Sequence, residues 1–209
     1  APAHLEGLGS LETVAAEKGR LLGGLGPEGV AVINADSPFA EQWVAAAPGP
    51  VVRFGLEADA DIRGEWWPEN GGGRLRAATP DGEVELALAL PGRHNAANAL
   101  AALAAAYALG IAPERAAAGM ETVIPAAGRL QLRSGPGGLT VLDDTYNANP
   151  GALEAALDVL TEGPGRTWAV LGDMGELGDD SAAWHAKAGE AARRRGVDRL
   201  IGGGPLAAG

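Results

Sequence analysis

The last third of the chain alternates between short apolar runs and amphipathic, helix-forming stretches. The runs at residues 139–142, 167–171 and 199–201 have the length and composition of buried strands, and helical spacing fills residues 150–160 and 182–195 between them. Strands that alternate with helices in this way are joined by crossover connections, which make neighbouring strands parallel. The sequence therefore predicts an α/β fold with a parallel sheet in this part of the chain.

The first fifty residues predict a helix, a strand and a second helix. Ser10 is placed to cap a helix that extends to about residue 25, where apolar residues recur at helical spacing. A short apolar run at 30–33 predicts a buried strand, and Ser37-Pro38 opens a helix to about residue 46.

Between residues 51 and 90 the pattern changes to short β-like pieces separated by turn-forming residues, which predicts a small antiparallel sheet. An alanine-rich helix follows at about 94–109, and Gly110 ends it. Residues 124–128 resemble a linker. We therefore expect a domain boundary near residue 130, with one domain at 1–129 and a second at 130–209.

Composition excludes several classes of function. The net charge is −11 and no basic stripe is present, so nucleic acid is not an expected partner. The chain has no cysteine, which excludes disulfides, a thiolate nucleophile and cysteine-ligated metals. No run approaches the roughly 18 apolar residues of a membrane span, and no secretion signal is evident. We expect a soluble, cytoplasmic protein.

Lys18 falls on the apolar stripe of the first predicted helix, together with Leu11, Val14 and Leu21. A buried ammonium must be paired or lose its charge, and burial would make the amine more nucleophilic; the alternative is an aliphatic stem that reaches to water. His4, just upstream, is open to two interpretations as well, as a hydrogen-bonded structural residue or as a metal ligand.

Two asparagines, Asn95 and Asn98, are three residues apart in the first turn of the alanine-rich helix. Their amide groups on one helix face can read the edge of a purine ring. The alternative is that one of them caps the helix, although capping explains two asparagines less well than one.

Polar residues also follow two strands of the predicted parallel sheet, where ligands gather in such folds. Asp143 and Asp144 end the first strand, and one of them can hold ribose or a cation, or form a turn. Asn149 is placed to cap the helix that Pro150 begins. The loop at residues 172–181 ends the next strand and leads to a helix that carries His185.

These segments together resemble the Mur ligase family, and within it the branch of UDP-N-acetylmuramoyl-tripeptide:D-alanyl-D-alanine ligases. The resemblance covers nearly the whole chain in order and rests on Ala3-His4-Leu5-Glu6-Gly7, Glu17-Lys18-Gly19, Asn34-Ala35-Asp36, Gly92-Arg93-His94-Asn95-Ala96-Ala97-Asn98-Ala99-Leu100, Gly128-Arg129, Asp143-Asp144-Thr145-Tyr146-Asn147-Ala148-Asn149-Pro150 and Gly172-Asp173-Met174-Gly175-Glu176-Leu177-Gly178. It implies the later part of a central ATPase domain followed by a truncated, Rossmann-like domain.

The resemblance also implies a reaction. Such ligases transfer the ATP γ-phosphate to a carboxylate of UDP-N-acetylmuramoyl-tripeptide, and the amine of D-alanyl-D-alanine attacks the acyl phosphate. ATP and Mg²⁺ are the implied cofactors, and a monomer is implied.

The resemblance assigns roles to individual residues. Lys18, carbamylated, and His4 would bind magnesium, and Lys18 and Arg129 would take part in catalysis. Asn95 and Asn98 would contact adenine, Arg129 the phosphates and Asp144 the ribose. The remaining residues, Asn147, Asn149 and His185, lie in branch motifs on the expected D-alanyl-D-alanine side.

The sequence departs from the family in one respect: it contains no Gly-x-x-Gly-Lys-[Ser/Thr] phosphate loop. We therefore expect an internal fragment that is inactive alone, because the γ-phosphate lacks its main electrostatic support. Two alternatives remain. The chain is part of another amide ligase of the superfamily, such as the folylpolyglutamate type or the diamino-acid-adding Mur enzyme, or it is a non-catalytic binding module.

Overall fold

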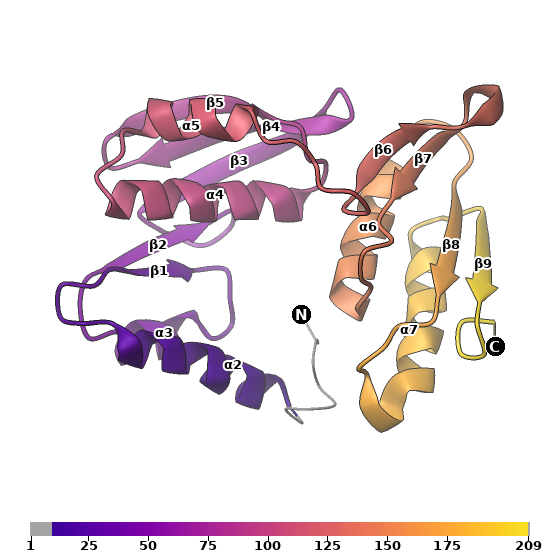
Figure 1. Cartoon of the computed structure of the whole chain (residues 1–209), viewed down its shortest axis with the longest axis horizontal. Helices are drawn as coiled ribbons and strands as arrows, with labels where there is room; N and C mark the ends of the chain where they lie inside the picture. Colours follow the sequence, from indigo (N-terminus) through magenta and orange to yellow (C-terminus); the bar gives the residue numbers. More distant parts are fainter. Residues whose placement is uncertain (1–9, 209) are drawn as a thin grey trace. The chain divides into compact units, whose positions relative to one another are not determined.

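The computed structural model describes residues 10–208, which form two compact units (Figure 1). One unit is Ala15–Ile124, and the other contains residues 125–208 together with residues 10–14. Helix α2 (Leu11–Arg20) begins at Ser10, whose hydroxyl accepts a hydrogen bond from the Thr13 amide at 3.2 Å, as predicted. A 3₁₀ turn, η1 (Leu21–Gly24), ends the helix.

The unit Ala15–Ile124 is built on a five-stranded mixed sheet in the order β1-β2-β3-β4-β5. Its strands are β1 (Ala31–Asn34), β2 (Val51–Gly55), β3 (Ile62–Glu69), β4 (Gly72–Thr79) and β5 (Gly82–Leu88). The pairs β1–β2 and β2–β3 are parallel, whereas β3–β4 and β4–β5 are antiparallel. The predicted antiparallel sheet is therefore three strands of a larger, five-stranded sheet, and the prediction was wrong for β2.

Strand β3 was not predicted because its inward position at Gly64 has no side chain. A Cβ at Gly64 would lie 2.8 Å from Leu75 Cδ1 and 2.9 Å from Leu100 Cδ2, so the packing of the core requires glycine there. The alternation of inward and outward residues is present in β3, but glycine hides it from a search for apolar residues.

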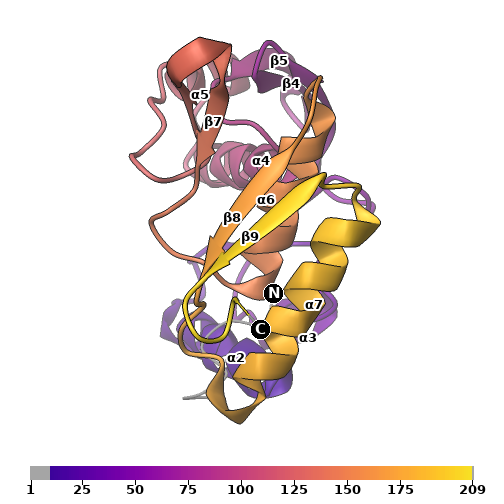
Figure 2. The same cartoon turned by 90° about the vertical axis from the view of Figure 1, so that its right-hand side faces the viewer.

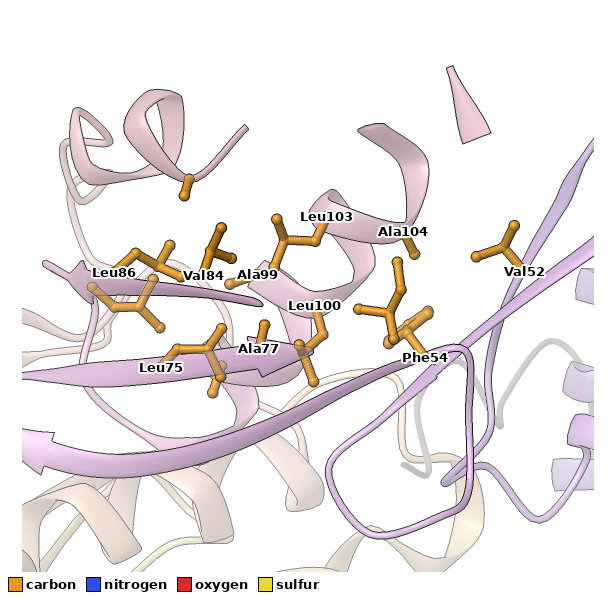
Figure 3. Packing of buried hydrophobic residues seen from close by; sticks show 14 residues of the cluster. Val52, Phe54, Leu75, Ala77, Val84, Leu86, Ala99, Leu100, Leu103 and Ala104 are labelled. Atoms are coloured by element: carbon orange, nitrogen blue, oxygen red, sulfur yellow. The ribbon is translucent and has the colours of Figure 1, made fainter. Parts of the chain in front are cut away.

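Helices α4 (Arg93–Ala108) and α5 (Pro113–Glu121) cover one face of this sheet, and α3 (Ala40–Ala46) packs beside β1. Figure 3 shows Leu100 and Leu103 of α4 directed at Leu75 and Ala77 of β4. The largest fully buried side chains are Ile62, Leu75, Leu86, Leu100 and Leu103. The small residues of α4 let it approach the sheet closely, so this unit has a dense core.

Asp36 joins the ends of two neighbouring strands in this unit. Its carboxylate accepts hydrogen bonds from the amides of Leu56, Glu57 and Ala58, at 2.7, 3.1 and 2.8 Å. These three amides follow β2, whereas Asp36 follows β1. Glu57 in turn forms an ion pair with Arg93 at the start of α4. The loop after β2 is thus fixed beside the first turn of α4.

The second unit contains two small sheets. Strands β6 (Gln131–Ser134) and β7 (Thr140–Asp143) form an antiparallel hairpin, and β8 (Trp168–Gly172) and β9 (Arg199–Gly203) are parallel (Figure 2). Helices α6 (Pro150–Glu162) and α7 (Ser181–Arg194) pack against each other beside β8 and β9. From β7 onward the predicted order of strands and helices is confirmed, as is the parallel pairing of the last two strands, whereas β6 was not predicted.

One prediction about this unit was wrong, because β7 was expected in a parallel sheet. Among the described strands β7 pairs only with β6, in antiparallel register from Gln131↔Asp143 to Ser134↔Thr140. The turn between them, η2 (Pro136–Gly138), contains Gly137 and Gly138 with φ of 67° and 81°, which closes a tight hairpin. None of the helices in residues 10–208 is long and apolar enough to cross a membrane.

Candidate functional site

A small pocket lies at the start of α4. It has a volume of about 170 Å³, and its lining is mainly apolar: Leu88, Ala89, Leu90, Asn95, Asn98, Ala99, Ala102, Met120 and Val123. Pockets for drug-sized ligands have about 300–1,000 Å³, so this one accommodates a single ring system rather than a whole nucleotide. Met120, near the end of α5, and Val123, just after it, were not predicted; their only signal in the sequence is their apolar character.

Asn95 and Asn98 provide the polar edge of this pocket. Asn95 donates from Nδ2 to the Pro91 carbonyl at 2.7 Å, and Asn98 donates from Nδ2 to Asn95 Oδ1 at 3.2 Å. Neither asparagine caps the helix, because Gly92 is the N-cap residue and no side chain bonds there. The hydrogen bonds orient both amides and leave Asn98 Oδ1 without a partner in the described residues. An apolar slot with an amide edge suits a flat, polar-edged ring.

The two aspartates after β7 have different surroundings, which separates the two interpretations of the pair. Asp143 Oδ1 accepts from the Thr145 hydroxyl at 2.7 Å, and Oδ2 pairs with Arg133 at 2.9 Å. The hydrogen bond from the Thr145 hydroxyl is the main cause of the lowered pKa of Asp143; the Thr145 amide and Arg133 also lower this pKa. Asp143 is therefore the turn-forming member.

Asp144 instead bonds to the chain segment just before β6. Its Oδ1 accepts a hydrogen bond from the Leu130 amide at 3.1 Å, and Oδ2 has no hydrogen-bond partner within residues 10–208. One oxygen of this carboxylate is therefore held in place while the other remains available to a ligand.

Arg129 lies beside Asp144 in the same pair of loops. The Tyr146 amide donates to the Gly128 carbonyl at 3.0 Å, and the Arg129 guanidinium lies over the Tyr146 ring with Cζ 4.1 Å from its centroid. Hydrogen bonds from Leu130 to Asp144 and from Tyr146 to Gly128 therefore join the two loops that carry Arg129 and Asp144. Tyr146 was not among the predicted residues, although it lies within a quoted motif.

The expectation of a buried Lys18 was wrong, because its side chain is exposed to solvent. Helix α2 packs through a different face. The Trp43 indole donates to the Ala15 carbonyl at 2.9 Å, and its ring lies 3.1 Å from where a Cβ of Gly19 would be. The small residues Ala15 and Gly19 thus contact the rest of the unit, whereas Leu21, on the predicted stripe, is 80% exposed. The physical argument from burial no longer applies to Lys18.

The predicted metal site is not formed by the described residues. His4 lies outside them, and within residues 10–208 no group of three His, Asp or Glu side chains could hold a metal ion. Donor chemistry in this part of the chain does not by itself fit a magnesium ion.

The three residues expected on the D-alanyl-D-alanine side differ in exposure and bonding. Asn147 is exposed, and Asn149 caps α6 by accepting from the Ala152 amide at 2.9 Å, as predicted for that cap. His185 is buried, with 6% of its surface exposed.

Both ring nitrogens of His185 are used within the protein. Nε2 accepts from the Met174 amide at 2.9 Å, and Nδ1 is 2.7 Å from the Ser181 carbonyl oxygen, to which it must donate. His185 therefore has no ring nitrogen left for a ligand, and it fixes the 172–178 loop to α7.

Comparisons with known proteins agree with this organisation. Residues 1–106 match the family described as the Mur ligase middle domain, and residues 128–207 match the Mur ligase glutamate ligase domain. The first match alone covers half of the chain.

Individual relatives point to one branch of this family. The chain is 41% identical to UDP-N-acetylmuramoyl-tripeptide–D-alanyl-D-alanine ligase of Escherichia coli over 204 residues, which are 96% of this chain and 45% of that ligase. The crystal structure of MurF from Acinetobacter baumannii superposes with a TM-score of 0.92 at 31% identity, covering 97% of this chain and 44% of the other. MurF of Thermotoga maritima in complex with ADP gives a TM-score of 0.86 at 26% identity, covering 98% and 47%.

The similarity is therefore continuous along this chain but extends over less than half the length of each relative. Two family domains in the expected order, and the same fold in solved MurF structures, place the chain in one family: it belongs to the Mur ligases and is similar to their D-alanyl-D-alanine-adding branch.

Proposed function

We propose that the complete protein containing this chain is an ATP-dependent ligase that adds D-alanyl-D-alanine to UDP-N-acetylmuramoyl-tripeptide in peptidoglycan synthesis. Similarity to MurF ligases over nearly the whole chain supports the substrates and the reaction. The observations that carry the nucleotide role are an Arg129 guanidinium in contact, among the described residues, with the Tyr146 ring only, and an Asp144 carboxylate that is held through one oxygen.

The nucleotide is proposed to contact two groups of residues: Asn95 and Asn98 on α4, and Arg129 and Asp144 on the loops around β6 and β7. The adenine ring fits the pocket at the start of α4, where Asn95 and Asn98 offer amide groups to its edge. Asp144 would accept hydrogen bonds from ribose hydroxyls through its free oxygen, and Arg129 would hold phosphate oxygens with charge-assisted bonds. The related MurF structure with ADP supports a nucleotide as the ligand.

The proposed reaction has two steps. A substrate carboxylate oxygen attacks the γ-phosphorus of ATP and ADP leaves; the D-alanyl-D-alanine amine then attacks the acyl carbon, and phosphate leaves with its electron pair. In both steps negative charge on phosphate oxygens must be balanced, which is the contribution we assign to Arg129. Asn147 and the cap residue Asn149 are proposed to lie on the D-alanyl-D-alanine side, with His185 acting only through the loop it holds.

Several further assignments rest on the family resemblance alone. Mg²⁺ as a cofactor, His4 and a carbamylated Lys18 as its ligands, and a catalytic role for Lys18 are proposals, and we assign no step to the metal. A monomeric, cytoplasmic protein is proposed as well. The domain boundary near residue 130 is supported by the family matches at 1–106 and 128–207.

The amine specificity and the nucleotide role can be tested in one assay on the complete protein. Phosphate release with UDP-N-acetylmuramoyl-tripeptide should be faster with D-alanyl-D-alanine than with glutamate, lysine or diaminopimelate. Asp144→Asn should raise the KM for ATP roughly tenfold, because a charge-assisted hydrogen bond is worth about 1.5–3 kcal/mol. Asp81→Asn, in an exposed turn, is the matched control and should leave the KM unchanged. A preference for another amine would contradict the proposed substrate.

The 209-residue chain alone is proposed to be inactive, because its sequence holds no phosphate loop. Isothermal calorimetry with ATP should show no stoichiometric binding. A saturating isotherm with one site would contradict this proposal and would indicate that Arg129, Asp144 and the α4 pocket suffice to bind the nucleotide.

A further inference from the structure

The backbone around Arg129 is held by an unusual local geometry. Gly128 has φ of 68° and Leu130 has φ of 48°, so two residues in the left-handed region flank the arginine. Such a conformation is costly for leucine and persists only where the surroundings enforce it. Here the Tyr146 amide binds the Gly128 carbonyl, and Asp144 accepts from the Leu130 amide at 3.1 Å. The backbone position of Arg129 is therefore fixed by the 144–146 loop.

The side chain itself has an aromatic partner and no anionic one. Its guanidinium carbon lies 4.1 Å from the centroid of the Tyr146 ring, and no carboxylate in residues 10–208 forms an ion pair with it. Three other arginines of this unit have carboxylate partners: Arg133 pairs with Asp143, Arg194 with Glu190, and Arg195 with Glu154 and Asp158. Arg129 thus keeps its full charge available while its position is restrained.

The contact of Arg129 with the Tyr146 ring is weaker than the hydrogen bonds that a guanidinium makes to phosphate, which suggests what the ring contact does. An exposed cation–π contact is weak, whereas a guanidinium bound to phosphate oxygens makes short, charge-assisted and often bidentate hydrogen bonds. Phosphate oxygens can therefore bind Arg129 without competing against a strong internal partner. A ring face also leaves the guanidinium N–H groups, which point outward in its plane, free to donate.

We propose that Tyr146 is a positioning residue: its ring holds the Arg129 guanidinium in one place, ready to bind the phosphates of the nucleotide. The proposal deepens the proposed function and rests on it for the identity of the ligand. The ring restricts the arginine before binding, so less conformational entropy is lost when the nucleotide arrives. The tyrosine hydroxyl has no part in this role.

The first experiment measures the contact in the 209-residue chain, without any assay of activity. A ring current should shift the Cδ protons of Arg129 upfield in ¹H–¹³C spectra of arginine-labelled protein. Tyr146→Phe should keep this shift and Tyr146→Leu should abolish it. Tyr146 is 69% exposed, and its hydrogen bond to Gly128 uses the backbone, so neither variant should unfold the chain. An Arg129 resonance unchanged by Tyr146→Leu would overturn the proposal.

The second experiment uses the complete protein and steady-state kinetics. Tyr146→Leu should raise the KM for ATP about two- to fivefold with little change in kcat, the range that corresponds to an exposed cation–π contact. Tyr146→Phe should behave as wild type. Trp168→Leu removes another arginine–aromatic contact of the same unit, with Arg199 at 4.9 Å, and should leave the KM unchanged.

The outcomes distinguish a failure of the role of Tyr146 from a failure of the proposed ligase function. An unchanged KM in Tyr146→Leu, in an enzyme where Asp144→Asn still raises it, would overturn the role of Tyr146 and leave the ligase assignment intact. An enzyme with no phosphate release in the presence of ATP, tripeptide substrate and D-alanyl-D-alanine would instead overturn the proposed function, whatever the spectra of Arg129 show.

Discussion

In the unit Ala15–Ile124, Asn95 and Asn98 stand on a long helix whose inner face is packed against a five-stranded sheet. In the second unit, Arg129 and Asp144 stand on two loops joined by backbone hydrogen bonds and one ring contact. The buried side chains differ in the same way. Leu75, Leu86 and Leu100 are fully buried in the large cluster of the first unit, whereas the second unit has two smaller separate clusters around Leu171 and Leu157.

The difference indicates how each group of residues is held ready for a ligand. A side chain on a helix with a dense core keeps its position because moving it would disrupt close packing. Loops that depend on a few hydrogen bonds open at a lower free-energy cost, and this property is common where a ligand must enter. The proposed adenine contacts, Asn95 and Asn98, should therefore be held rigidly, whereas the proposed phosphate and ribose contacts, Arg129 and Asp144, should be more adaptable.

The largest effect is expected from removing part of the dense core. Leu100→Ala should lower the free energy of unfolding by about 2–5 kcal/mol, because Leu100 is fully buried between α4 and the sheet. Urea unfolding followed by tryptophan fluorescence measures it, since Trp66 and Trp67 lie in β3 of the same unit. Leu109→Ala, 77% exposed at the end of the same helix, is the control and should change stability by less than about 0.5 kcal/mol.

A smaller effect is expected from the histidine that fixes the 172–178 loop. His185→Ala leaves the Met174 amide without its acceptor in a buried place, which should cost about 2 kcal/mol. Hydrogen exchange at the Met174 amide should accelerate more than exchange in α6. His185→Gln, which can supply an acceptor again, should recover part of the protection, and Glu190→Ala on the exposed side of α7 should change neither quantity. Unchanged exchange in His185→Ala would show that packing alone holds the loop.

Glycine substitutions test how closely the two loops around Arg129 fit together. Gly128→Ala should destabilise by about 1–2 kcal/mol from its left-handed backbone alone. The new methyl group would also lie 3.0 Å from the Tyr146 amide nitrogen. Gly137 has nearly the same φ, 67°, but a Cβ added there would have no atom within 4 Å. Gly137→Ala therefore has the backbone cost without a steric contact and serves as the control. Equal effects of the two variants on unfolding would show that the contact between the loops contributes nothing.

The smallest effect concerns Asp36 and depends on pH. Burial alone would raise the pKa of Asp36, but the amide hydrogens of Leu56, Ala58 and Glu57 lower it below its ordinary value of 3.8. Stability from the ionised form is then complete above that value and is lost as the pH falls through the lowered pKa. Asp36→Asn should cost about 1 kcal/mol at pH 7. In urea unfolding the difference from wild type should shrink below about pH 4; a difference that grows on acidification would contradict this sign.

Much of the secondary structure could be predicted because its signals are local. The Ser10 and Asn149 caps, the alanine-rich helix closed at Gly110 and the alternation along residues 139–201 all depend on neighbours in sequence. Strand β3 and the pairing of β7 could not be predicted in this way. Glycine is required at position 64 by the side chains of Leu75 and Leu100, which are distant in sequence. The pairing of β7 with β6 depends on how the chain folds in space, and the residues of β7 alone do not specify it.

The predictions for the candidate site also differ in whether they depend on local sequence or on distant partners. The resemblance of their motifs to one family predicts Asn95, Asn98, Arg129 and Asp144 as nucleotide contacts, and this remains a prediction. The sequence could not decide which of Asp143 and Asp144 forms the turn, since that depends on Arg133 across the hairpin and on Leu130 beyond it.

What the sequence determined by itself is the family, the order of helices and strands, and the kinds of side chain available for a nucleotide. Only the tertiary structure decided that Lys18 is exposed, that both nitrogens of His185 are engaged and that Tyr146 lies under Arg129. The physical reason is that helical spacing shows which residues share a face of a helix, but not which face the rest of the protein covers. Burial and hydrogen bonding depend on partners from distant parts of the chain, here Trp43 for α2 and the Met174 amide for His185.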